Sequence, residues 1–227
     1  MEDFENKYIL NNKIATQLID ILKGRCPLDS EYPKAQISSL YFDTPNLDLL
    51  KEKINSDFIK TKYRVRWYKD FHQGTAKGQC FLEVKSKWGE IRNKKRKLLE
   101  IPSTRMESIS FNSDSFNDIN NEFQLLKPSF SPLIPQYVVS YKRVRFKYPG
   151  TEIRFCLDFD INVPRMNNHL GALVNTNSKL ANAVFEIKGP EEDLPEMMKI
   201  IETWGGQKNS FSKYLECYQM IKNIKEF

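Results

Sequence analysis

The residues most able to do chemistry are lysines and arginines at alternate positions of several short segments. In the clearest of these, residues 60–67, basic side chains alternate with Thr or with apolar side chains (Lys60, Lys62, Arg64 and Arg66 against Thr61, Tyr63, Val65 and Trp67). Successive side chains of a β-strand point to opposite faces, so the four cations are expected on one face. Arg engages phosphate oxygens bidentately and Lys acts as a point charge, so this face is suited to holding a chain of phosphates.

The same pattern recurs in nearly every segment that we predict to be a strand. The polar positions are basic at Lys7, Arg64, Arg66, Lys85, Lys87, Lys94, Arg96, Arg143, Arg145, Lys147, Arg154 and Lys188, and acidic at Glu5, Glu83, Asp158 and Glu186. One such strand is usually the solvated face of a one-sided sheet, but the recurrence favours a functional interpretation. If the sheet closes, these side chains lie inside it. Because burying unpaired cations costs several kcal/mol each, the interior then needs water, acids, a metal or an anionic ligand.

The elements that must position these residues follow from hydrophobic periodicity and turn signals. Strands are predicted at residues 3–10, 36–42, 60–67, 80–87, 93–99, 137–148, 152–163 and 183–188. Helices are predicted from an Asn11–Asn12 cap to Gly24, after Asn46 through Ile54, at 191–204 and at 212–224. Residues 102–135 form the least regular stretch, with part of a helix at 122–127, and residues 167–181 are predicted to be a surface loop. The Gly205–Ser210 segment lacks the spacing of a phosphate loop and is interpreted as a helix end and turn.

Composition bounds the class of protein. The chain has 227 residues, 40% of them hydrophobic, and a net charge of +6, which favours a single domain over residues 1–227 with anionic partners. No basic and apolar leader begins the chain and no run approaches the roughly 20 apolar residues of a membrane span, so we expect a cytoplasmic protein. Its four cysteines form no Cys-x-x-Cys pair and its two histidines are isolated, so neither a zinc site nor a disulfide framework is indicated.

These segments also resemble a known family. Asp3-Phe4-Glu5-Asn6-Lys7-Tyr8 is similar to the E-x-E-x-K strand of the triphosphate tunnel metalloenzymes, with Asp3 in place of the first Glu. Nine fragments occur in the order seen in the VTC domain, the polyphosphate polymerase domain of the vacuolar transporter chaperone: Lys7-Tyr8, Ser39 to Thr44, Tyr63 to Tyr68, Glu83-Val84-Lys85, Lys94-Lys95-Arg96, Tyr141-Lys142-Arg143, Arg154 with Asp158, Phe185 to Lys188, and Ser212-Lys213-Tyr214. The resemblance covers nearly the whole chain.

The resemblance implies an α+β, mainly antiparallel β fold in which eight strands close into a β-barrel tunnel with flanking helices. It implies that ATP or another nucleoside triphosphate enters, that Mn²⁺ or Mg²⁺ helps to position it, and that its γ-phosphate passes to inorganic polyphosphate. Carried over by position, the residues that act on phosphates are Arg64, Arg66, Lys85, Arg143 and Arg154, together with Lys7, Lys94, Arg96, Lys188 and Lys213. Lys213 also opens the last predicted helix, whose N-terminus favours an anion. Glu186 is the expected main metal ligand, while Glu5, Glu83 and Asp158 are auxiliary ligands or internal salt-bridge partners.

Three other functions compete with phosphoryl transfer to polyphosphate. The first is a triphosphatase acting on tripolyphosphate or a nucleoside triphosphate in the same tunnel. The second is a module that binds polyphosphate without turnover, because binding and transfer use the same cations. The third, nucleic-acid binding, is not expected, because no recognised nucleic-acid motif is present. The oligomeric state is not indicated by the sequence.

Overall fold

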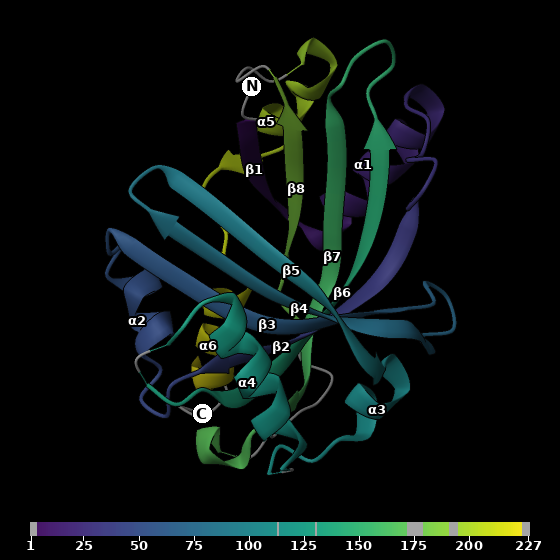
Figure 1. Ribbon diagram of the computed structural model, residues 1–227. Coiled ribbons are helices and arrows are strands. Elements are labelled where there is room, and N and C mark those ends of the chain that lie inside the picture. The colour runs from purple at the N-terminus through teal and green to yellow at the C-terminus, as the bar shows by residue number, and fades with distance from the viewer. Residues whose placement is uncertain (1–3, 113, 130, 172–178, 191–194, 224–227) are drawn as a thin grey trace. The chain divides into compact units, whose positions relative to one another are not determined.

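A computed structural model describes residues 4–112, 114–129, 131–171, 179–190 and 195–223 (Figure 1). The chain divides into two compact units, each described by itself. Unit 1 comprises Met1–Gln36, Tyr141–Asn162 and Lys179–Ser212, and unit 2 comprises Ile37–Ser140, Val163–Ser178 and Lys213–Phe227. Three strands contribute residues to both units, so the single-domain organisation stays a prediction. Asp3 lies outside the described residues.

The fold is α+β, with a mainly antiparallel sheet and flanking helices, as predicted. The strands are β1 (Phe4–Asn11), β2 (Lys34–Asp43), β3 (Ile59–Lys69), β4 (Ala76–Trp88), β5 (Ile91–Pro102), β6 (Ile134–Lys147), β7 (Arg154–Met166), β8 (Asn182–Gly189) and β9 (Gln207–Lys208). The predicted eight strands all exist, and β9 lies where only a helix end and turn were expected.

The prediction of a closed β-barrel tunnel is wrong. The strand order is β5-β4-β3-β2-β6-β7-β8-β1-β9, so among the described residues the sheet ends at β5 and β9 rather than closing on itself. β9 has only two residues and pairs with β1 through Tyr8 and Ile9. It is therefore too short to pair with β5, the opposite edge strand, which has twelve residues. Alternation had fixed which side chains share a face, but closure requires two edge strands to pair, which alternation does not determine.

The helices are α1 (Asn12–Arg25), α2 (Asp48–Ile54), α3 (Ser103–Ser108), α4 (Ser115–Leu126), α5 (Ile200–Thr203) and α6 (Lys213–Asn223), with 3₁₀ turns at Asn168–Leu170 and Glu196–Met198. The predicted cap of α1 is confirmed, since the Ile14 N–H donates to Asn11 Oδ1 at 2.8 Å. Two helices, α3 and α4, lie in the stretch expected to be least regular. The helix predicted at 191–204 is instead the second 3₁₀ turn followed by the four-residue α5, and its residues 191–194 lie outside the described part. None of the described helices has the length and hydropathy of a membrane span.

The core of unit 2 explains why the basic side chains of β3 and β4 share one face. Their apolar alternates pack with side chains of α3 and α4 in a buried cluster that includes Tyr63, Val65, Leu82, Met106 and Phe123. The Phe123 ring meets the Tyr63 ring edge-on, with centroids 5.2 Å apart. With one face of the hairpin committed to this core, alternation turns the polar residues to the opposite face.

Candidate functional site

The register of β3, β4 and β5 sets basic residues side by side in rows across the three strands. One row is Lys60–Lys87–Arg92, the next is Lys62–Lys85–Lys94, and the third is Arg64–Glu83–Arg96. We call the face formed by these nine residues and Arg66 the basic face. Eight of the nine row positions are Lys or Arg. Like charges directly opposite on adjacent strands are destabilising, so this arrangement lowers the stability of the empty sheet and favours a bound anion.

Glu83 is the one carboxylate among the residues of the basic face, and only 1% of it is exposed. Its Oε2 accepts from Arg64 Nη2 at 2.6 Å and from Arg64 Nε at 2.8 Å, and lies 3.6 Å from Arg66 Nη1. Its Oε1 lies 3.3 Å from Lys94 Nζ and 3.6 Å from Arg96 Nε. One carboxylate therefore has four cationic side chains around it, and the positive charge exceeds the negative.

The electrostatics of this group fix Glu83 as an anion. Burial raises the pKa of its carboxyl, but the charges of Arg64, Arg66 and Lys94 outweigh burial and hold that pKa well below its usual range. The Arg64 and Arg66 side chains are only 11% and 10% exposed, whereas Lys94 and Arg96 are 47% and 38% exposed. Lys94, which is more exposed than Arg64 and lies farther from Glu83, can therefore reorient toward a ligand at a lower free-energy cost than Arg64 can.

Other side chains hold the arginines of the basic face in place. The Arg96 guanidinium stacks over the Phe81 ring at 3.7 Å and donates to Tyr68 Oη at 3.3 Å. Arg64 Nη1 donates to Tyr41 Oη at 3.2 Å, and Arg66 Nε donates to Ser39 Oγ at 3.3 Å. Because stacked and hydrogen-bonded guanidinium groups lose little freedom when they bind, these arginines are preorganised for an anion.

The Ser39-to-Thr44 fragment has a structural role that the sequence did not show. Buried Asp43 accepts from the Leu49 N–H at 2.9 Å, the Leu50 N–H at 3.0 Å and Tyr214 Oη at 2.8 Å, which joins the end of β2 to α2 and α6. Tyr214 also stacks on Tyr41 with centroids 4.8 Å apart. Through Tyr41 this network reaches Arg64, so it helps to position the basic face.

Neighbouring lysines on β5 differ in role because they point to opposite faces. Lys94 approaches Glu83, whereas Lys95 donates to the Leu126 carbonyl at 2.6 Å and Lys97 pairs with Glu122 at 2.5 Å, both on α4. Strand parity thus divides a run of basic residues into those on the basic face and those that contact α4.

A second polar group, in unit 1, mixes acids with bases. Glu186 on β8 faces Lys7 on β1, and Lys188 faces Glu5. Lys188 Nζ lies 2.9 Å from Glu186 Oε1 and 3.3 Å from Glu5 Oε2, and Lys7 Nζ contacts Glu5 closely and lies 3.9 Å from Glu186. With Arg143, Arg154 and Asp158 we call these seven residues the mixed-charge cluster. Its charges nearly balance, unlike those of the basic face.

Arg143 and Asp158 form a bidentate ion pair within the mixed-charge cluster. Arg143 Nε lies 2.5 Å from Asp158 Oδ1 and Nη2 lies 2.6 Å from Oδ2, while Asp158 is 1% exposed. This bidentate geometry is the salt-bridge arrangement weighed for Asp158 from the sequence. Arg154 is exposed and faces Lys188 across the β7–β8 pair.

The carboxylates of the mixed-charge cluster are the described groups best suited to a divalent metal. Among the described residues, no group of three or more His, Cys, Asp or Glu side chains could hold a metal alone. Burial raises the pKa of Glu186, but Arg143 and Lys188 outweigh it and lower that pKa, so the carboxylate is ionised at neutral pH. Mg²⁺ is commonly held by one or two carboxylates completed by substrate phosphates, and Glu5 with Glu186 fits this requirement. Glu83 fits it less well, because cations surround both of its oxygens.

Comparison with known proteins identifies the family. A model of the VTC domain matches residues 2–222 of this chain. This chain belongs to the VTC domain family. The resemblance found in the sequence fragments is therefore confirmed. No curated protein matches the chain.

Comparison with solved structures finds similar chains at low sequence identity. A "putative adenylate cyclase" from Bacillus halodurans is 16% identical, with a TM-score of 0.53 over 93% of this chain and 96% of that one. A Hippeastrum protein described as having a dominant triphosphatase activity is 19% identical, with a TM-score of 0.48 over 94% of this chain and 93% of that one. The first likeness supports the fold alone.

The structure gathers the predicted site residues into two groups. Arg64, Arg66, Glu83, Lys85, Lys94 and Arg96 lie on the basic face, and Glu5, Lys7, Arg143, Arg154, Asp158, Glu186 and Lys188 lie in the mixed-charge cluster. Lys213 begins α6, beside Tyr214, as predicted. The site prediction omitted Lys60, Lys62, Lys87 and Arg92, although Lys60 and Lys62 share the parity of Arg64 and Lys87 shares that of Lys85. The binding roles of the predicted site residues stay predictions.

Proposed function

We propose that this VTC domain is a metal-dependent enzyme that transfers the γ-phosphate of ATP to the end of an inorganic polyphosphate chain. The observation that carries the proposal is the basic face, where four cations surround the single carboxylate of Glu83. Such an excess of partly buried positive charge is compensated by a ligand with several adjacent negative charges. A chain of phosphates has that chemistry, and membership of the VTC family supports the same substrate class.

The residues fit the requirements of phosphoryl transfer, which needs positioning and charge neutralisation more than a protein nucleophile. A terminal oxygen of polyphosphate attacks the γ-phosphorus of ATP, the bond from that phosphorus to the bridging oxygen breaks, and ADP leaves with the electron pair. In this proposal Arg66, Lys94 and Arg96 bind phosphate oxygens and neutralise the charge that develops on them. Glu5 and Glu186 would hold Mn²⁺ or Mg²⁺, which supplies further charge neutralisation when bound.

Hydrolysis of a triphosphate is the second candidate, and the mixed-charge cluster is the observation that favours it. Glu5 and Glu186 are carboxylates that could orient an attacking water, and in a hydrolase the cations Lys7, Arg154 and Lys188 of the same cluster would bind the phosphates. The products separate the two activities. Transfer gives ADP and a ladder of acid-labile polyphosphate, whereas hydrolysis gives free phosphate without a ladder. Tight polyphosphate binding with no nucleotide turnover would instead identify a binding module.

The decisive assay incubates the purified chain with ATP and Mn²⁺ and resolves the products on a gel. Lys94→Gln and Lys95→Gln form a matched pair, because the two residues are adjacent on β5 but face opposite sides. Lys94→Gln removes a charged phosphate contact worth ~1.5–3 kcal/mol, so kcat/KM should fall roughly 10- to 150-fold. Lys95→Gln should leave kcat/KM within about twofold. Equal effects of the two changes would contradict the assignment of the basic face.

A further inference from the structure

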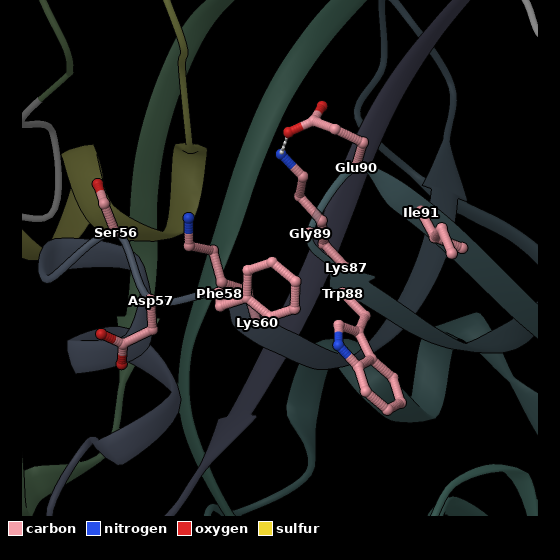
Figure 2. Close-up of a pocket in the computed structure, with 9 residues that line it drawn as sticks. All are labelled: Ser56, Asp57, Phe58, Lys60, Lys87, Trp88, Gly89, Glu90 and Ile91. Atoms are coloured by element: carbon pink, nitrogen blue, oxygen red, sulfur yellow. Dashed lines mark hydrogen bonds and ion pairs between the residues drawn. The ribbon is translucent and has the colours of Figure 1, made fainter.

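A pocket of about 620 Å³ lies at the end of the basic face, within unit 2 (Figure 2). It is lined by Ser56, Asp57, Phe58, Lys60, Lys87, Trp88, Gly89, Glu90 and Ile91. This volume is in the range of small-molecule sites, and the lining combines aromatic and aliphatic surface with a few polar groups. The reaction proposed above does not use this pocket.

The apolar side chains of the pocket are unusually exposed. Phe58 and Trp88 are each 66% exposed and Ile91 is 73% exposed. Exposed aromatic residues that adjoin one another in a concave surface mark a binding site more often than scattered ones do. Figure 2 shows Phe58 and Trp88 on neighbouring parts of the lining, with the amino groups of Lys60 and Lys87 extending to one side of the Phe58 ring.

The pocket is continuous with the basic face. Lys60 and Lys87 face each other across β3 and β4 as one row of that face, and both also line the pocket. Arg64 follows Lys60 by four positions along β3, which is ~13 Å at the rise of a β-strand. A ligand whose phosphates lie along the rows would place whatever group is attached to its first phosphate near Lys60.

The backbone fixes the position of the Phe58 ring. The Gly89 N–H donates to the Phe58 carbonyl at 3.0 Å, which ties the start of β3 to the β4–β5 turn. Gly89 has φ +57°, and a Cβ there would come within 2.8 Å of Phe58 Cζ. The far end of the ring therefore lies against Gly89, while 66% of Phe58 stays exposed and can be reached by a ligand.

We propose that this pocket binds the base of a nucleoside triphosphate, with Phe58 as the stacking surface and Trp88 beside it, so that the domain discriminates nucleotides from inorganic tripolyphosphate. The inference rests on the proposed function, because it assumes that phosphates lie on the basic face. Ser56 and Asp57 supply polar groups able to hydrogen-bond a base. The pocket's two acidic residues, Asp57 and Glu90, disfavour the other occupant that its aromatic and basic composition suggests, an anionic lipid surface.

The test compares equilibrium binding of adenosine 5′-(β,γ-imido)triphosphate and of inorganic tripolyphosphate in buffer containing EDTA, which suppresses metal-dependent turnover. Stacking of one base on an aromatic side chain is worth ~1–3 kcal/mol, so Phe58→Ala should weaken the nucleotide about 5- to 150-fold. Tripolyphosphate affinity should change less than about twofold. Phe58→Trp should restore nucleotide affinity, and Leu125→Ala, an exposed apolar change on α4, serves as the matched control.

Trp88 provides a readout that is independent of activity. Nucleotide should change the indole fluorescence of the wild type, tripolyphosphate should not, and Trp88→Phe should abolish the response. Equal weakening of both ligands by Phe58→Ala, or no weakening of either, would overturn the base pocket while leaving the phosphate site intact. If the wild type binds neither ligand, with EDTA or with Mg²⁺, the proposed function fails and the pocket inference with it. Binding of anionic vesicles that depends on Trp88, without nucleotide discrimination, would also overturn it.

Discussion

Replacing Glu83 by Gln tests the reasoning about the basic face most directly. The change keeps the shape of the side chain but removes the carboxylate that the nearly buried Arg64 and Arg66 share. Removing one partner of a buried ion pair costs ~3–5 kcal/mol, because the remaining charge stays desolvated without its counter-ion. For a chain of this size each kcal/mol lowers Tm by ~2–4 °C, so the variant should melt roughly 6–20 °C below the wild type.

A polyphosphate ligand should reverse much of this loss. Tripolyphosphate supplies the negative charge that the Glu83→Gln variant lacks, so the variant should bind it more tightly than the wild type and gain more Tm from it. The measurement is thermal unfolding of both proteins with and without tripolyphosphate. Glu122→Gln is the control: its partner Lys97 is on the opposite face and is 45% exposed, so the change should cost at most ~1 kcal/mol and show no ligand dependence.

The difference in stability between the wild type and Glu83→Gln should depend on pH in a defined direction. The pKa of Glu83 is lower in the folded state than in the unfolded state, so its stabilisation is present above the unfolded pKa of about 4.3 and is lost as the pH falls toward the folded pKa. The Tm difference between wild type and Glu83→Gln should therefore shrink below pH ~4. A variant as stable as the wild type, or a deficit that neither pH nor tripolyphosphate alters, would refute the reasoning.

The remaining predictions concern the mixed-charge cluster and the domain. Arg143→Met removes the bidentate partner of buried Asp158 and should cost ~3–5 kcal/mol in urea unfolding, most of which a second change, Asp158→Leu, recovers. Glu186→Gln should raise the Mn²⁺ concentration needed for half-maximal turnover, and unchanged metal dependence removes it as a ligand. Glu186 and Glu5 raise the pKa of Lys188 above its ordinary value despite burial, so its stabilisation should be lost at alkaline pH, and Lys188→Met should flatten that decline. Calorimetry should show one unfolding transition if residues 1–227 form one domain; two separable transitions would contradict this.

Some of the structure could be predicted from the sequence because it depends on local patterns. Alternation located β3 and β4 and assigned Arg64 and Arg66 to the face opposite Tyr63 and Val65. The Asn11 cap and the start of α6 at Lys213 followed from the preferences of helix ends. These features depend on residues close together in the chain, which is why one sequence was sufficient.

Other features depend on contacts between distant segments. Helix α3 and the first part of α4 were missed because proline, serine and asparagine dominate their surroundings, whereas packing of Met106, Phe116 and Phe123 against the sheet stabilises both helices. Strand parity had already placed Lys94 and Lys95 on opposite faces, but their partners, Glu83 for Lys94 and the Leu126 carbonyl for Lys95, depend on contacts between distant segments. The pocket at Phe58 and Trp88 carried no motif, because its two walls come from segments that are far apart in the chain.

The sequence by itself determined that cations recur on one face of successive strands and that their order matches the VTC family, because strand periodicity and motif order are properties of the chain. Only the tertiary structure decided that the described strands form an open sheet and that the Glu83 carboxylate lies among four cationic side chains. It also decided that Glu5 and Glu186 both contact Lys7 and Lys188. Strand pairing sets these outcomes, since register determines which charges become neighbours. A one-residue shift of β5 on β4 would place Lys95 rather than Lys94 opposite Lys85, with every side chain turned to the other face.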